Sequence, residues 1–74
     1  MVIVKLNLSL IKLVNKKKLE LNIQGPKTLN EVLNEIGLSQ NDIGMVLKNG
    51  RWAPLDCLIE ENDTVQLFPH LEGG

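Results

Sequence analysis

Residues 2–10 read VIVKLNLSL, the clearest alternation of apolar and polar side chains in the chain. Apolar side chains occupy every even position, while Lys5, Asn7 and Ser9 lie between them. A period of two is typical of a β-strand with one buried face. The stretch therefore predicts a strand over residues 2–10, with its even positions facing a hydrophobic core.

A second strand is predicted at Leu19, Leu21 and Ile23, where the same alternation returns. Residues 15–18, which read NKKK, form a polar corner between the two stretches. We therefore predict an N-terminal hairpin of two strands joined by a turn. A lysine run can attract an anionic partner, but at a hairpin tip it is more often a solvated loop, and we expect the loop here.

One helix is predicted after Gln24-Gly25-Pro26, which breaks the second strand. Thr28 and Glu31 have the spacing of a capping box, in which each side chain satisfies a free amide at the helix start. Gly37 suits the left-handed position that ends a helix. Between the caps the apolar side chains recur at helical spacing, and we expect this stripe to face the core: Leu29, Val32, Leu33 and Ile36.

A second hairpin is predicted around Asn49-Gly50, which lies between the apolar residues 45–47 and Trp52. Both turn residues readily adopt positive φ, so the turn alone explains them. Pro54 has no amide to donate, so the strand that contains Trp52 must be short.

The last strand is predicted at residues 64–68, after a turn at 61–63 and before Pro69, which stops it. The connector 55–60 is predicted to be an irregular segment that tucks apolar side chains under the sheet. We expect Cys57 to be one of these buried side chains.

The predicted order is strand, strand, helix, strand, short strand, connector, strand, which indicates an α+β fold with one mixed sheet covered by the helix. The first and last strands are both strongly apolar, so we expect them to pair in parallel at the centre of the sheet. The 74 residues form a single domain, 1–74. A chain of this size buries only roughly 60% of its unfolded surface, which leaves no room for a large substrate cavity.

The composition argues against several classes of function. A net charge of -1 and 3% aromatic residues are not those of a nucleic-acid-binding protein. No apolar run approaches the roughly 20 residues of a membrane span, so we expect no membrane partner and a cytoplasmic location.

The sequence also predicts no self-contained active site. His70 and Cys57 are the only histidine and cysteine, so we expect no metal site and no activated thiol. The carboxylates are scattered, and no glycine-rich phosphate loop is present.

The end of the sequence, Phe68-Pro69-His70-Leu71-Glu72-Gly73-Gly74, is the feature that carries chemistry. A diglycine has no side chain to obstruct a narrow channel, follows almost any backbone path and presents an unhindered carboxylate. ATP turns a carboxylate into an electrophile by forming an acyl-adenylate. Because this chain has no phosphate-binding motif, the ATP site would lie on a partner.

This terminus, together with the Lys48-Asn49-Gly50 hairpin and the strand TVQLFP at 64–69, resembles the MoaD/ThiS family of ubiquitin-like β-grasp sulfur carriers over the whole chain. Two positions depart from the family pattern. His70 stands where a second proline is usual, and Glu61-Asn62-Asp63 replaces the common Asp-Gly-Asp turn. The turn departure is mild because Asn62 tolerates positive φ.

The resemblance implies a β-grasp fold, with a mixed sheet of four to five strands on one main helix and a flexible C-terminal diglycine tail at residues 68–74. It implies that an E1-like adenylyltransferase adenylates the Gly74 carboxylate, beside the slim Gly73, and that a sulfur donor converts it to a thiocarboxylate. The tail would then deliver sulfur inside a synthase subunit. ATP would be used by the partner, and no cofactor would be bound by this chain. The Phe-Pro ending favours the molybdopterin branch, and thiamine or another thiolation pathway is the alternative.

We expect partner contacts from Phe68, Pro69, His70 and Leu71. Phe68 either lies on the open sheet face as an anchor for a partner pocket or caps the core. A carrier that docks in turn on at least two enzymes gains nothing from burying that face in a homodimer, so we expect a monomer. Two other functions stay open: a ubiquitin-like modifier that passes the Gly74 carbonyl to a lysine, and a non-covalent interaction module.

Overall fold

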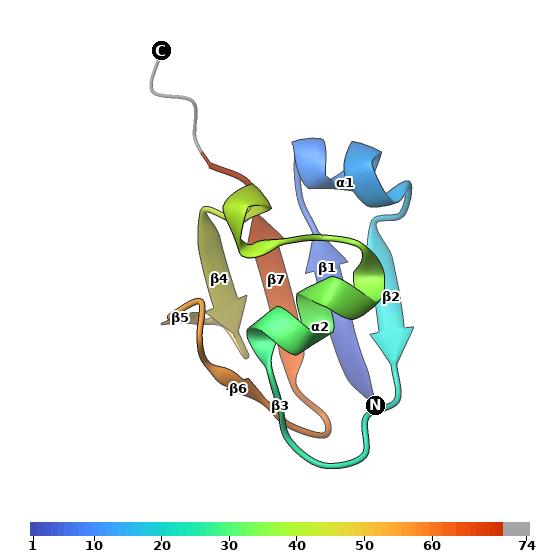
Figure 1. The fold of residues 1–74 in the computed structure, drawn as a ribbon, viewed down its shortest axis with the longest axis vertical. Helices are drawn as coiled ribbons and strands as arrows, with labels where there is room; N and C mark the ends of the chain where they lie inside the picture. Colours follow the sequence, from blue (N-terminus) through green and yellow to red (C-terminus); the bar gives the residue numbers. More distant parts are fainter. Residues whose placement is uncertain (71–74) are drawn as a thin grey trace.

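The computed structural model describes residues 1–70 of the chain. Its strands are β1 (Val2–Leu6), β2 (Lys18–Leu21), β3 (Lys27–Thr28), β4 (Met45–Lys48), β5 (Arg51–Ala53), β6 (Leu58–Ile59) and β7 (Thr64–Phe68). Its helices are α1 (Ser9–Val14), α2 (Leu29–Ile36) and the 3₁₀ helix η1 (Gln40–Asp42). Five strands form the main sheet in the order β2-β1-β7-β4-β5, and β3 pairs with β6 in a separate two-stranded sheet (Figure 1).

The centre of the main sheet is the parallel pair β1 and β7, as the two apolar strands predicted. Val4 lies opposite Val65, and Leu6 lies opposite Leu67. β7 pairs on its other side with β4 in antiparallel orientation. The mixed sheet of the predicted α+β fold is therefore confirmed. Its most apolar strands lie at the centre, where each strand pairs with a neighbour on both sides.

Helix α2 lies across one face of the main sheet (Figure 1). Leu29, Val32 and Leu33 are fully buried, and Ile36 packs against the edge of the core. The helical stripe is thus core, as expected. The sheet contributes the inward positions of its strands to the same cluster: Val2, Val4, Leu6, Val46, Ala53, Val65 and Leu67.

The predicted caps of α2 are confirmed. The Thr28 hydroxyl accepts a hydrogen bond from the Glu31 N–H at 3.2 Å, and the Glu31 carboxylate accepts one from the Thr28 N–H at 3.1 Å. The bond from the Thr28 N–H, followed by the bond from its hydroxyl, lowers the pKa of Glu31. Gly37 ends the helix at φ 87°.

The N-terminal hairpin differs from the prediction. β1 ends at Leu6 rather than Leu10, and helix α1 replaces the second half of the predicted strand. A short apolar run fits both periods, but the strand period would bury Leu8, which is 63% exposed. The helix instead turns Leu10, Ile11 and Val14 toward the core. β1 and β2 still pair antiparallel, with Val4 opposite Leu19, but a helix joins them instead of a turn.

The lysine run also differs in part from the prediction. Lys18 belongs to β2, whereas Lys16 and Lys17 lie exposed before it, as a solvated loop requires. The second strand ends at Leu21, so Ile23, which is 8% exposed, reaches the core from a loop.

The connector 55–60 is more regular than predicted. It contains β6, whose Ile59 lies opposite Lys27 of β3. Ile59 is fully buried, but Leu58 is 51% exposed and Cys57 is only half-buried. Strands of two residues carry no readable period, so the sequence alone could not reveal this small sheet.

Both predicted turns are confirmed by their backbone angles. Asn49 and Gly50 adopt φ 54° and 83°, and Asn62 adopts φ 72°. The Asn49 side chain joins the two turns, since it donates to the Asp63 carboxylate at 2.9 Å and accepts from the Thr64 N–H at 2.8 Å. The other Asp63 oxygen accepts from the Glu60 N–H at 2.8 Å.

This network predicts a pH dependence of stability. Burial alone would raise the pKa of Asp63, but the bonds from Glu60 and Asn49, with the charge of Lys48, outweigh it and lower that pKa. A carboxyl with a lower pKa in the folded state stabilises the fold above its unfolded pKa of about 3.9. That contribution is lost as the pH falls through the folded pKa.

We therefore expect Asp63→Asn to weaken the dependence of the unfolding free energy on pH below about pH 4. The measurement is urea denaturation of both proteins between neutral pH and about pH 3. The exposed Asp56 supplies the matched control, Asp56→Asn, which should keep the wild-type acid dependence. An Asp63→Asn profile parallel to that of the wild type would contradict the assignment.

Candidate functional site

Three strand ends meet at one edge of the main sheet. β1 and β7 are parallel and end at this edge, and the antiparallel β4 begins there. The N–H and the side-chain amide of Asn7 both donate to the carbonyl of Leu67, at 3.2 and 3.1 Å. The Gly44 N–H donates to the carbonyl of Phe68 at 2.8 Å. The segments after β1 and before β4 therefore flank the point where β7 ends.

A groove of about 380 Å³ lies at this edge, and we call it the root groove because the C-terminal tail follows from it. Its lining is mainly apolar and, within the described part of the chain, includes no carboxylate, lysine or arginine. The lining residues are Leu8, Gly44, Met45, Trp52, Phe68, Pro69 and His70.

The root groove gathers exposed apolar side chains. Trp52 is 70% exposed, Leu8 63% and Met45 39%. Phe68 lies opposite Met45 in the β4–β7 ladder and points to the sheet face away from the fully buried Leu67. Of the two positions considered for Phe68, the structure shows the open face. Clustered exposed apolar residues mark sites where proteins bind partners.

Leu8 is held in an unusual backbone conformation, φ 55° and ψ -132°, between the end of β1 and the start of α1. A residue with a Cβ is strained there by about 1–3 kcal/mol. The strain accompanies a leucine whose side chain projects into solvent at the root groove instead of packing in the core.

The structure brings Phe68, Pro69 and His70 together in the root groove. Leu71, Gly73 and Gly74 lie outside the described residues. Sequence reasoning missed Leu8, which it assigned to a strand, and it did not link Met45 or Trp52 to the terminus. The available signal was the parallel pairing of the first and last strands, because parallel strands bring the residues that follow them to one edge.

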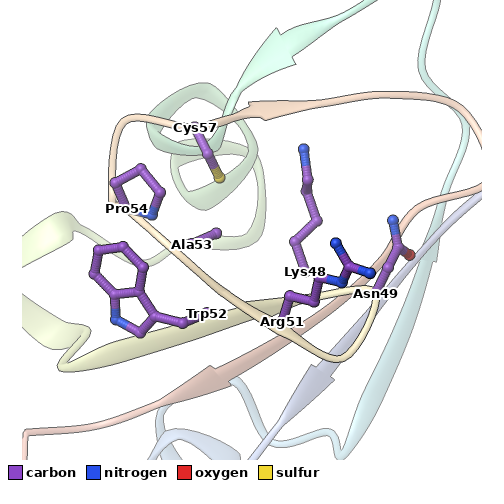
Figure 2. Close-up of a pocket in the computed structure, with 7 residues that line it drawn as sticks. All are labelled: Lys48, Asn49, Arg51, Trp52, Ala53, Pro54 and Cys57. Atoms are coloured by element: carbon purple, nitrogen blue, oxygen red, sulfur yellow. The ribbon is translucent and has the colours of Figure 1, made fainter.

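A second hollow, of about 600 Å³, lies between the β4–β5 hairpin and the segment after β5 (Figure 2). The Trp52 side chain lines this hollow as well as the root groove. Figure 2 shows the Cys57 sulfur pointing inward from the loop, with Lys48 on one side of the hollow and Trp52 and Pro54 on the other. The Lys48 amine donates a hydrogen bond to the carbonyl of Leu58 at 3.0 Å. This charged group is therefore engaged in a contact that supports the fold.

The surroundings of the Cys57 thiol act on its pKa in two directions. Burial raises its pKa, and the charge of Lys48 opposes this shift without reversing it. The reactive form of cysteine is the thiolate, which a raised pKa depletes at neutral pH. That Cys57 is not an activated thiol stays a prediction.

The part of the chain that spans residues 1–70 holds no cluster of three or more His, Cys, Asp or Glu side chains able to bind a metal ion. It also contains no helix long and apolar enough to cross a membrane.

Solved structures share this fold. SAMP1 from Haloferax volcanii matches with a TM-score of 0.75 and 23% identity, over 99% of this chain and 98% of that one. A Pyrococcus furiosus protein provisionally assigned as molybdopterin converting factor subunit 1 matches with a TM-score of 0.74 and 19% identity, over 95% and 97%. At these identities the matches show the fold alone, and that fold is the ubiquitin-like β-grasp.

A comparison of the sequence with curated proteins found no match. The family is shown instead by a match to a family model. The family model for the ThiS family matches residues 4–74, which include the main sheet apart from Val2 and Ile3, the root groove and the diglycine. The resemblance to the MoaD/ThiS sulfur carriers is thereby confirmed, and the chain belongs to the ThiS family.

Proposed function

We propose that this chain is a sulfur carrier whose Gly74 carboxylate is adenylated by an E1-like enzyme and then converted to a thiocarboxylate. The observation that carries the proposal is the root groove, an apolar surface at the base of the segment that ends in Gly73-Gly74. An enzyme that docks there receives the diglycine in the same encounter. Family membership supports an E1-like enzyme and a synthase as the kinds of partner.

Distance limits where the partner's chemistry can occur. Four residues follow His70 in the sequence, and a fully extended chain spans at most about 3.6 Å per residue. The Gly74 carboxylate therefore lies within about 14 Å of His70. Six residues follow Phe68, so the partner's ATP site must lie within about 22 Å of the pocket that receives Phe68, and Pro69, His70 and Leu71 line the path between them.

The proposed chemistry has two steps. A carboxylate oxygen of Gly74 attacks the α-phosphorus of ATP, the bond to the β-phosphate breaks, and pyrophosphate leaves. Hydrosulfide from a sulfur donor then attacks the activated carbonyl, AMP leaves, and the product is a thiocarboxylate. Both the nucleotide and the sulfur source belong to partners, and this chain contributes the carboxylate and the docking surface.

The sulfur is proposed to serve molybdopterin synthesis. The Phe68-Pro69 ending favours that branch, and the Pyrococcus furiosus neighbour carries a molybdopterin-related name. Delivery of sulfur for the thiamine thiazole or another thiolation pathway is the alternative.

The direct test is the intact mass of the protein before and after incubation with ATP, sulfide and an E1-like enzyme active on its own carrier. We expect one oxygen to be replaced by sulfur, and fragmentation to locate the change at Gly74. Deletion of Gly73 and Gly74 should abolish the change. An unmodified wild-type chain in the presence of the active enzyme would contradict the proposal for that partner.

A ubiquitin-like modifier is the second candidate, because a neighbour of this fold from Haloferax volcanii is named small archaeal modifier protein 1. In that case the activated Gly74 carbonyl would pass to a lysine amine of a target protein. Conjugates that disappear when target lysines are blocked would support this function. If the chain lacking Gly73-Gly74 retained full function in cells, neither covalent function would hold, and a non-covalent module would remain.

Leu8 offers a prediction in which stability and binding change in opposite directions. Leu8→Gly should raise the free energy of unfolding by about 1 kcal/mol, because relief of the positive φ exceeds the entropy cost of glycine. The same variant should bind the E1-like enzyme more weakly, because an exposed apolar contact is lost.

Leu8→Ala is the matched control for this prediction. It removes the same contact but keeps the Cβ and therefore the strain, so it should weaken binding without raising stability. The measurements are urea denaturation and calorimetric titration of both variants. If Leu8→Gly lowered stability, the proposed strain would be wrong.

A further inference from the structure

Gly44 lies between η1 and β4. The reason for a glycine at this position differs from the reason at the other described glycines. Gly25, Gly37 and Gly50 have positive φ, whereas the φ of Gly44 lies outside the left-handed region. Its backbone conformation would therefore accept any residue. The reason for a glycine at this position must therefore lie in the atoms that a side chain at Gly44 would contact.

The backbone of residues 69–70 occupies that space. A Cβ at Gly44 would lie 2.7 Å from the Cα of His70, 2.7 Å from the carbonyl oxygen of Pro69 and 2.9 Å from the nitrogen of His70. Non-bonded carbon atoms pack at about 3.5–4.0 Å, so these contacts are prohibitive. All three atoms belong to backbone, so no side-chain rotation can relieve the overlap. The root of the tail would have to move.

The contact is anchored on both sides. Ile43, the residue before Gly44, is fully buried, and so is Leu67, two residues before Pro69. The bond from the Gly44 N–H to the Phe68 carbonyl, at 2.8 Å, continues the β4–β7 ladder past the Met45–Phe68 pair. Gly44 thus holds the backbone of residues 69–70 in place where the chain leaves the sheet. We call this contact between Gly44 and residues 68–70 the seat.

We infer that Gly44 is a positioning residue of the carrier, which sets the place and direction in which residues 71–74 start. This inference rests on the proposed function, since it matters most if Gly74 must reach a reacting atom on a partner. The tail spans at most about 14 Å, so a shift at the seat is passed to the carboxylate over few residues. Misplacement of reacting groups by about 1 Å can cost on the order of 100-fold in rate.

The test is Gly44→Ala, measured as ATP-dependent release of pyrophosphate with an E1-like enzyme active on its own carrier. We expect kcat to fall about 10- to 100-fold, with KM within about threefold of the wild type, because the apolar docking side chains are kept. In ¹⁵N-resolved spectra the His70 amide should shift, and the residue-44 amide should exchange faster because its bond to Phe68 is weakened. A general loss of stability would instead speed the exchange of all protected amides and would leave the His70 amide resonance in place.

Gly37→Ala is the matched control. It strains a positive-φ position with nothing within 4 Å of the added Cβ, so it lowers stability without touching the tail. It should keep the wild-type kcat and the wild-type His70 resonance. Folded Gly44→Ala with wild-type kcat and an unmoved His70 amide would overturn the inference.

A second variant covers the case in which Gly44→Ala does not fold. Insertion of one glycine between His70 and Leu71 leaves the seat intact but moves the diglycine away from it, and kcat should fall. If this insertion retained the wild-type kcat, the tail would not be positioned from the seat, and the inference would be wrong. A wild-type chain that the active enzyme does not adenylate at all would instead overturn the proposed function, and the positioning role with it.

Discussion

Leu67→Ala is expected to lower the free energy of unfolding by about 2–5 kcal/mol. Leu67 is fully buried in β7, the middle strand of the main sheet, with Leu6 and Val46 as its partners on the two sides. Removing its side chain loses buried apolar surface and leaves a cavity that two paired strands cannot close. Domains of this kind are stable by only about 5–15 kcal/mol, so the loss is a large share of the total.

The measurement is urea denaturation followed by circular dichroism. Gln66→Ala is the matched control, because Gln66 belongs to the same strand but lies on its half-exposed face, and it should cost less than about 1 kcal/mol. The fraction of Leu67→Ala that is folded should bind the E1-like enzyme with wild-type affinity. A Leu67→Ala protein as stable as Gln66→Ala would show that the core does not depend on β7.

Phe68→Ala, one residue further along, is expected to have the opposite profile. Its affinity for the E1-like enzyme should fall by about 2 kcal/mol, or roughly 30-fold, because a central aromatic side chain leaves the docking surface. Its free energy of unfolding should fall by only about 1 kcal/mol, since Phe68 lies half-exposed in the root groove and not in the core.

Calorimetric titration and urea denaturation of the same preparation separate the two effects. Leu58→Ala is the matched control for the loss of exposed apolar surface, because Leu58 is 51% exposed and does not line the root groove. It should bind like the wild type. A large loss of stability in Phe68→Ala, with unchanged affinity, would mean that this ring supports the fold instead of a partner.

Elements with a strong local signal were predicted correctly. The capping box of Thr28 and Glu31, the stop at Gly37 and the Asn49-Gly50 turn depend on interactions within a few residues, so short sequence windows contain them. The boundary between β1 and α1 was not predictable in this way. Residues 8–10 fit a strand as well as a helix, and only the end of the ladder at Leu6 and the exposure of Leu8 decide between them.

The candidate site shows the same division. The diglycine and the Phe-Pro ending stand out in the sequence because chemistry and resemblance both point to them. Leu8, Met45 and Trp52 do not, because exposed apolar residues scattered along a chain have no significance until the fold gathers them. Gly44 is the extreme case, since its neighbours Pro69 and His70 lie 25 and 26 positions away.

By itself, the sequence determined the α+β class, the parallel pairing of its first and last strands, the family and the residue proposed to react. These follow from periodicity, local hydrogen bonding and a terminal motif, all of which are properties of contiguous residues. Only the tertiary structure decided which apolar side chains stay exposed, where they meet, and which glycine supports the root of the tail. Those features arise because the parallel β1 and β7 end at one sheet edge where β4 begins, which brings distant residues into contact.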